Sequence, residues 1–86
     1  LISNYEKYLE VHGVVGCRVG GEFKRIEGIR VNIYEKDNKF LHETSEYKNE
    51  TVTNKKGEFK ISGHDKDFAD PTFYVWISLS CEFAMR

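Results

Sequence analysis

Strict alternation of apolar and polar side chains marks two segments of this sequence. In residues 73–81 every odd position is apolar or cysteine, whereas the even positions carry tyrosine, tryptophan and serine. In residues 29–35 isoleucine and valine alternate with arginine, asparagine and tyrosine. A period of two is the repeat of an extended chain with one face against a core. Both segments are therefore predicted to be β-strands with one buried face.

Weaker signals predict four further strands. Gly13 and Gly16 interrupt the first of them, where an internal glycine indicates a bulge or bend. Asp37-Asn38 is a predicted turn, and Gly57 closes a hairpin-type turn that begins at Asn54. The four predicted strands span residues 11–19, 40–45, 50–53 and 58–61.

Six short strands separated by turn signals predict an all-β fold, an antiparallel β-sandwich or barrel. The polar run 64–71 is expected to hold a single helical turn before Pro71. We expect one domain over residues 11–86, preceded by an N-terminal extension over residues 1–10.

Composition limits the classes of partner. With 13 basic and 14 acidic residues among 86, the formal charge is -1. This balance lacks the one-sided positive field that non-specific nucleic-acid binding requires, so no nucleic-acid partner is expected. Six Phe, five Tyr and one Trp supply enough large apolar side chains for one small core.

Cys17 and Cys81 are the two cysteines, and no CxxC pair or zinc-finger spacing accompanies them. Both occupy the predicted core-facing parity of their strands, which favours a disulfide over two buried free thiols. Asn49-Glu50-Thr51 fits the N-glycosylation pattern in a polar stretch, so Asn49 is a candidate glycosylation site.

Four motifs in a fixed order resemble the transthyretin-like family of nematodes. They are VHGVVGC at 11–17, GIRVNIYEKD at 28–37, GEFKISG at 57–63 and DPTFYV at 70–75, followed by Cys81. The resemblance spans residues 11–81. It implies a prealbumin-like β-sandwich, a secreted, extracellular location, and a disulfide at these two cysteines.

The chain also departs from that pattern. Residues 21–28 lack the proline often found between the first two strands of the family, and relatives continue through further strands after the segment that ends here. An apolar sheet face and an unpaired sheet edge are therefore expected to be exposed, which favours a homo-oligomer or a covering partner. Carboxypeptidase-regulatory-like modules, which are passive spacers, are the alternative with the same architecture.

Catalytic and metal-binding signatures are weak in this sequence. No nucleophile elbow, phosphate-binding glycine loop or His-Glu-x-x-His pair is present, and the Tyr-Arg-Gly-Ser ending of hydroxyisourate hydrolases is replaced by Phe-Ala-Met-Arg. We expect no enzyme activity, no cofactor and no metal. The acidic run is expected to be a solvated loop and not a calcium site, and lone histidines in strands are expected to be ordinary surface residues. The residues concerned are His12, His42, His64, Asp65, Asp67 and Asp70.

Tyr74 and Trp76 lie on the face of their strand opposite the predicted core, and they form the candidate binding face. Together these features predict an extracellular binding or bridging protein. Its sheet face or loops would contact an extracellular protein, a lipid surface or a small apolar ligand. The alternative is a structural spacer without a ligand of its own.

Overall fold

The structure is a computed structural model that describes residues 5–39, 42–67 and 72–84. These residues form seven strands and one short helix. In chain order they are β1 Tyr5–Val14, β2 Gly16–Val19, β3 Glu22–Arg25, β4 Arg30–Lys39, β5 His42–Val52, β6 Glu58–Asp67, β7 Thr72–Ile77 and α1 Cys81–Ala84.

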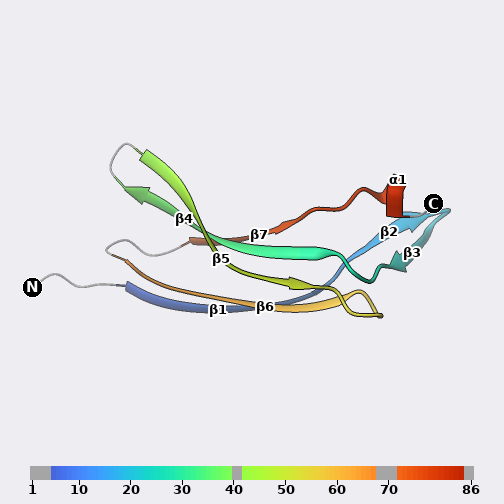
Figure 1. The fold of residues 1–86 in the computed structure, drawn as a ribbon, viewed down its shortest axis with the longest axis horizontal. Helices are drawn as coiled ribbons and strands as arrows, with labels where there is room; N and C mark the ends of the chain where they lie inside the picture. Colours follow the sequence, from blue (N-terminus) through green and yellow to red (C-terminus); the bar gives the residue numbers. More distant parts are fainter. Residues whose placement is uncertain (1–4, 40–41, 68–71, 85–86) are drawn as a thin grey trace, which may run out of the picture.

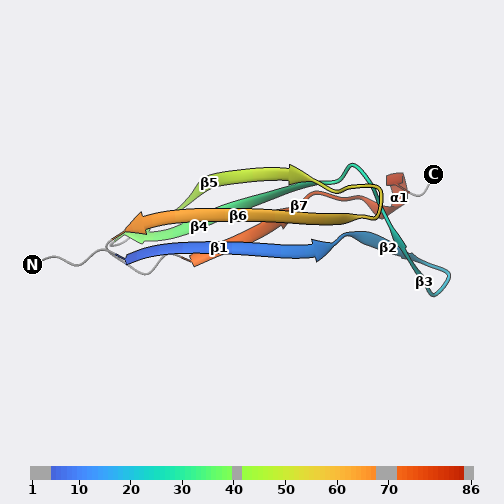
Figure 2. The same ribbon diagram turned by 90° about the horizontal axis from the view of Figure 1, so that it is seen from below.

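The strands pair antiparallel in two layers and a hairpin. Sheet A contains β1 and β6, sheet C has the order β5-β4-β7, and β2 pairs with β3. Sheet A packs across sheet C, and the β2-β3 hairpin extends from one end (Figures 1 and 2). The result is an elongated molecule of 57 × 24 × 19 Å. It is an all-β, sandwich-like antiparallel fold, as the sequence predicts.

A small core fills the space between the two sheets. Val31 and Ile33 on β4 are fully buried, and Ile61 on β6 and Val15 are almost so. The sheets approach closely at Gly63, where an added Cβ would lie 3.1 Å from the Phe73 ring. Because only a few side chains are buried, the fold needs support from outside its apolar core.

Cys17 and Cys81 form a disulfide with an S–S distance of 2.03 Å, which confirms the predicted pair. Cys17 is buried, but Cys81 is exposed and begins α1. The prediction that both sulfurs share core-facing strand positions was therefore wrong for Cys81. β7 ends at Ile77, and the chain bends before Cys81, so strand parity no longer determines its direction.

Neutral hydrogen bonds close the same end of the sandwich. The buried Thr53 hydroxyl donates to the Ile26 carbonyl at 2.7 Å and accepts from the Ile29 amide at 2.9 Å. In the next turn the Asn54 side chain accepts from two backbone amides, and Gly57 adopts a φ of 71°. The predicted Asn54–Gly57 turn is thus confirmed.

Several predicted boundaries were wrong. The predicted strands 40–45 and 50–53 correspond to one strand, β5 His42–Val52, with residues 40 and 41 outside the described part of the chain, and the predicted turn at Asp37-Asn38 lies within β4. The segment 64–67 continues β6 instead of forming a helical turn, while 68–71 lie outside the described residues. β1 begins at Tyr5, so the boundary drawn at residue 11 falls inside a strand, and β3 lies in residues 20–28, which no predicted strand covered. In each case pairing with a neighbouring strand outweighed the local polar composition.

Candidate functional site

Three tyrosines from the three strands of sheet C form a row on its outer face. Tyr34 on the central strand β4 is in register with Tyr47 on β5 and with Tyr74 on β7. The Tyr34 and Tyr74 rings stack with centroids 5.3 Å apart, and Tyr47 meets Tyr34 edge-on at 6.0 Å. Both geometries are favourable for aromatic pairs, so the row is a preformed surface.

Trp76 lies beside the end of this row that Tyr74 forms on β7. It lies two residues after Tyr74 on β7 and is 59% exposed, while Tyr47 is 52% exposed. Opposite Trp76, the Asn32 side-chain oxygen is buried and has no hydrogen-bond partner within the described part of the chain. We call Tyr34, Tyr47, Tyr74 and Trp76 the aromatic face. Exposed aromatic side chains on a flat sheet are suited to contact another macromolecule, since they bury a large area at little entropic cost.

Sequence reasoning found half of this surface. Tyr74 and Trp76 occupy the outer face, as their parity predicts, although their binding role stays a prediction. Tyr34 was also predicted to point away from the core of its own strand, but nothing in the sequence connected it with Tyr74 and Trp76. Tyr47 was missed, because a register shift on β5 sets its direction. Ile33 pairs with Asn49 and Tyr34 pairs with Tyr47, which leaves Lys48 as the extra residue of a bulge.

The outer face of sheet A has a different character, with charged and polar side chains along β1 and β6. The His12 ring donates a hydrogen bond to the Glu10 carboxylate at 2.6 Å, and the His64 ring donates one to the Glu6 carboxylate at 3.0 Å. The bond to His12 lowers the pKa of Glu10, although that carboxylate is in solvent. The two histidines thus each have their own carboxylate on an open surface.

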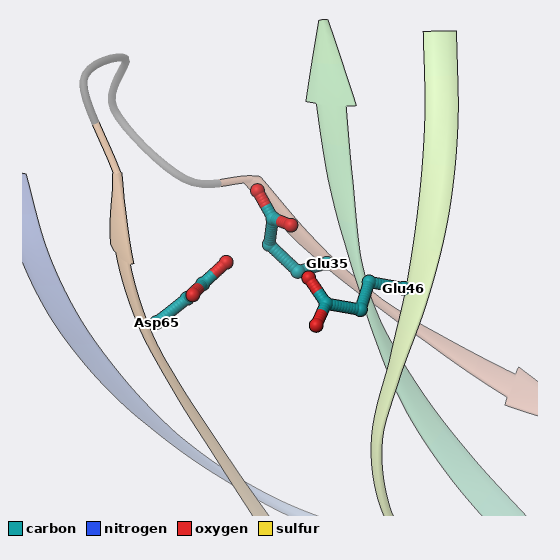
Figure 3. Close-up of side chains that lie close together, drawn as sticks. All are labelled: Glu35, Glu46 and Asp65. Carbon is teal, nitrogen blue, oxygen red and sulfur yellow. The ribbon is translucent and has the colours of Figure 1, made fainter.

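A cluster of charges lies between the sheets at the end opposite the disulfide. Glu35 on β4 is 1% exposed, and its carboxyl lies near those of Glu46 on β5 and Asp65 on β6, with oxygens within 4.8 Å of one another (Figure 3). The bulge directs Lys48 into this cluster, where its ammonium is 3.3 Å from both Glu46 and Asp65. Lys48 therefore links β5 to β6 across the two sheets.

The protonation of this cluster follows from its contacts. Burial opposes the charge of Asp65, but hydrogen bonds from the Lys66 amide and the Glu35 carboxyl, together with Lys48, lower its pKa overall. Burial also opposes the charge of Lys48, yet its bonds to Asp65 and Glu46 raise its pKa overall. Asp65 and Lys48 thus form an ion pair.

This arrangement changes the candidate cation ligands. His64 and Asp65 are successive residues of β6 and face opposite sides, so they do not form the acidic loop considered for calcium. Asp70 lies outside the described residues, and the side chains of Asp67 and His42 are not described. The carboxylates that do converge are Glu35, Glu46 and Asp65, and a divalent ion would have to displace Lys48 from them.

Asn49 lies on β5 and is exposed. Its side-chain amide nitrogen, the atom that would carry a glycan, donates to the Ser62 carbonyl on β6 at 3.2 Å. A glycan would replace one of the two hydrogens of this nitrogen, beside the link between the edges of the two sheets. Glycosylation of Asn49 stays a prediction.

Two other surface features lie away from the aromatic face. An open hollow of about 400 Å³ is lined by Glu58 and Lys60 as well as Val52 and Phe59. Exposed basic residues occupy the β2-β3 hairpin and the β5-β6 turn, and acidic residues lie among them. The basic residues are Arg18, Lys24, Arg25, Lys55 and Lys56.

Taken together, the fold and its surfaces define a class of small all-β module with a disulfide and an exposed aromatic sheet face. The model of the transthyretin-like family matches residues 13–85, most of the chain, and the protein belongs to this family. Comparisons with curated proteins and with solved structures find no significant match. Membership confirms the resemblance drawn from the sequence motifs.

Proposed function

We propose that this chain is a secreted binding protein that presents its aromatic face to an extracellular protein. The exposure of Trp76 and Tyr47 beside the Tyr34-Tyr74 stack supports this role. Aromatic residues of this kind are enriched at the energetically dominant positions of protein interfaces. No catalytic step is part of the proposal.

The disulfide supports the location. Cys17 and Cys81 are joined across 64 positions of the chain, and such bonds persist in oxidising compartments. Among the described residues, no helix has the length and apolar composition needed to span a membrane. Secretion would be tested by finding the oxidised chain in extracellular material.

A protein partner suits the aromatic face better than the other expected ligands. The face is a sheet surface and not a cavity, whereas small apolar ligands are usually enclosed. The hollow near Phe59 has Glu58 and Lys60 in its lining, which also disfavours an apolar guest. The exposed basic residues of the β2-β3 hairpin and the β5-β6 turn, which an anionic lipid surface would attract, lie outside the aromatic face and have acidic residues among them.

The proposal is tested by comparing matched variants of the two outer faces. Y47S/W76S removes two exposed side chains from sheet C, and Y8S/V14S removes two from sheet A, where Tyr8 and Val14 are 65% and 40% exposed. The wild-type domain is immobilised to capture extracellular proteins, and affinities for a captured protein are then measured. Y47S/W76S should weaken binding by about tenfold or more, while Y8S/V14S should leave it within about twofold.

Two results would contradict this assignment. Equal weakening by both double variants would place the contact elsewhere. If anionic vesicles but no protein were captured, and Y47S/W76S kept full vesicle binding, the function would belong to the basic residues of the β2-β3 hairpin and the β5-β6 turn instead. The alternative of a passive spacer is favoured by the elongated 57 Å shape, and it predicts no capture at all.

A further inference from the structure

Tyr34 and Tyr74 hold their rings close together and nearly parallel. They are register partners on β4 and β7, and the pairing of these two strands has no irregularity. Register partners in an antiparallel sheet have Cβ atoms about 5 Å apart. The ring centroids are 5.3 Å apart and the ring planes differ by only 14°. Rings in this arrangement need to slide past one another, without turning, to bring two carbons ortho to the hydroxyls into contact.

Tyr47 makes a different contact with Tyr34. Its ring centroid is 6.0 Å away and the planes differ by 73°, so the edge of one ring meets the face of the other. A bond between two ortho carbons would require one of these rings to turn by most of a right angle inside the row. Among the three tyrosines of the row, the geometry therefore favours coupling of Tyr34 with Tyr74.

The surroundings of this pair suit an oxidative reaction. Both cysteines of the chain are in the disulfide, so no free thiol is present. A thiolate is readily oxidised by peroxide and would also reduce a tyrosyl radical. Trp76 and Tyr47 are 59% and 52% exposed on the same face of the sheet. An oxidant that takes an electron from either exposed ring can thus oxidise the half-buried pair through neighbouring rings.

We propose that Tyr34 and Tyr74 are a site of oxidative cross-linking, at which hydrogen peroxide acting through a haem peroxidase joins the two rings as dityrosine. Each phenol gives up one electron and releases one proton to water, and becomes a phenoxyl radical. The two radicals form a carbon–carbon bond between ortho positions, and the hydrogen on each of these carbons then moves to the phenolic oxygen of its own ring. The pair loses two hydrogen atoms, and one peroxide molecule takes up two electrons and two protons to give two water molecules.

The bond would fasten β7 to the centre of sheet C. Among the described strands β7 pairs only with β4, and the disulfide at Cys81 lies beyond its end. A link at Tyr74 would hold the middle of the strand, on the face away from the core. This inference goes beyond the proposed function, because no binding partner takes part in the reaction.

The cross-link can be located directly, because trypsin would place each of the five tyrosines on a separate peptide. The dilute wild-type protein is treated with a haem peroxidase and hydrogen peroxide. The monomer mass should fall by two hydrogen atoms, and the blue fluorescence of dityrosine should appear. After reduction and digestion, the linked peptides should contain Tyr34 and Tyr74. Linked peptides that contain Tyr47 or Tyr8 instead, or the absence of any linked pair, would overturn the proposal.

Three phenylalanine substitutions test the choice of this pair. Phenylalanine keeps the ring but has no hydroxyl from which a phenoxyl radical can form, so Y34F and Y74F should each abolish the linked peptides without unfolding the sheet. Y47F is the matched control, since it removes a hydroxyl from the same face and should retain them. Loss of the linked peptides in Y47F as well would show that the stacked geometry does not select the pair.

A comparison with the unfolded chain tests whether the sheet is responsible. Photosensitised oxidation by a ruthenium complex and persulfate is carried out on the folded protein and on the reduced chain in concentrated urea. The folded protein should give mainly the Tyr34-Tyr74 link, and the unfolded chain a mixture of tyrosine pairs. The same preference in both samples would overturn the proposal. Capture of a protein by the aromatic face is measured separately, so each result can fail without the other.

Discussion

The two ends of the sandwich are closed by different chemistry. At the covalent end, defined by Cys17, Cys81 and Thr53, a disulfide and neutral hydrogen bonds hold the loops together. At the charged end, defined by Glu35, Glu46, Lys48 and Asp65, one lysine bridges carboxylates from the two sheets. Both ends therefore add stability to a fold with a small apolar core. The interactions at the covalent end do not depend on pH, whereas those at the charged end depend on the protonation of the carboxylates.

Removing the disulfide should have the largest effect on stability. In C17A/C81A the unfolded chain regains the freedom of a loop of 64 positions, which corresponds to about 4 kcal/mol in the loop-entropy model. Urea unfolding of the variant, compared with oxidised and reduced wild type, measures this loss. Reduced wild type should match the variant, and a loss below about 1 kcal/mol would show that the disulfide does not support the covalent end.

Replacing Lys48 should have the next largest effect. K48M keeps the apolar stem but leaves Asp65 and Glu46 without their shared cation, and should lower the free energy of unfolding by about 2 kcal/mol. Lys48 is 14% exposed, whereas Lys60 is 65% exposed beside Glu10. K60M is therefore the matched control, with an expected change below about 0.5 kcal/mol. Equal effects of the two variants would remove the special role of the charged end.

A smaller effect is expected at Thr53. T53V keeps the shape of the side chain but leaves the Ile29 amide and the Ile26 carbonyl without their partner, which should cost about 1 to 2 kcal/mol. Thr51, two residues earlier on the same face, has a hydroxyl with no hydrogen bond in the described structure, so T51V is the control. Thermal unfolding of both variants tests the difference, which should vanish if the Thr53 bonds are unimportant.

The smallest expected effect is a change in the slope of stability with pH. The folded-state pKa of Asp65 is lowered, so its contribution is fully present above the unfolded-state pKa and is lost as the pH falls through the folded value. The urea midpoint of wild type should therefore fall as the pH is lowered through this acidic range. In D65N that fall should be less steep. C17A/C81A should lower the urea midpoint at all pH values without changing its slope against pH. If the slope of the urea midpoint against acidic pH were the same in D65N and wild type, the acid sensitivity would come from other carboxylates.

The alternation of apolar residues was sufficient to predict the first half of β4, the existence of β7 and the side of the sheet on which Tyr74 and Trp76 lie. The turn at Asn54–Gly57 was equally predictable, since local hydrogen bonds and a positive φ define it. β5 was not, because its residues are mostly polar and only pairing with β4 keeps them extended. The family itself was recognised from short motifs and confirmed over residues 13–85.

The sequence by itself determined the all-β class and the faces of the regular strands, because these follow from local periodicity. It favoured a disulfide between its two cysteines, and the structure confirmed that disulfide. The tertiary structure alone decided where Tyr47 joins Tyr34 and how Lys48 reaches Asp65. Both depend on a one-residue register shift between β4 and β5, and a strand's register is set by its neighbours and not by its own residues.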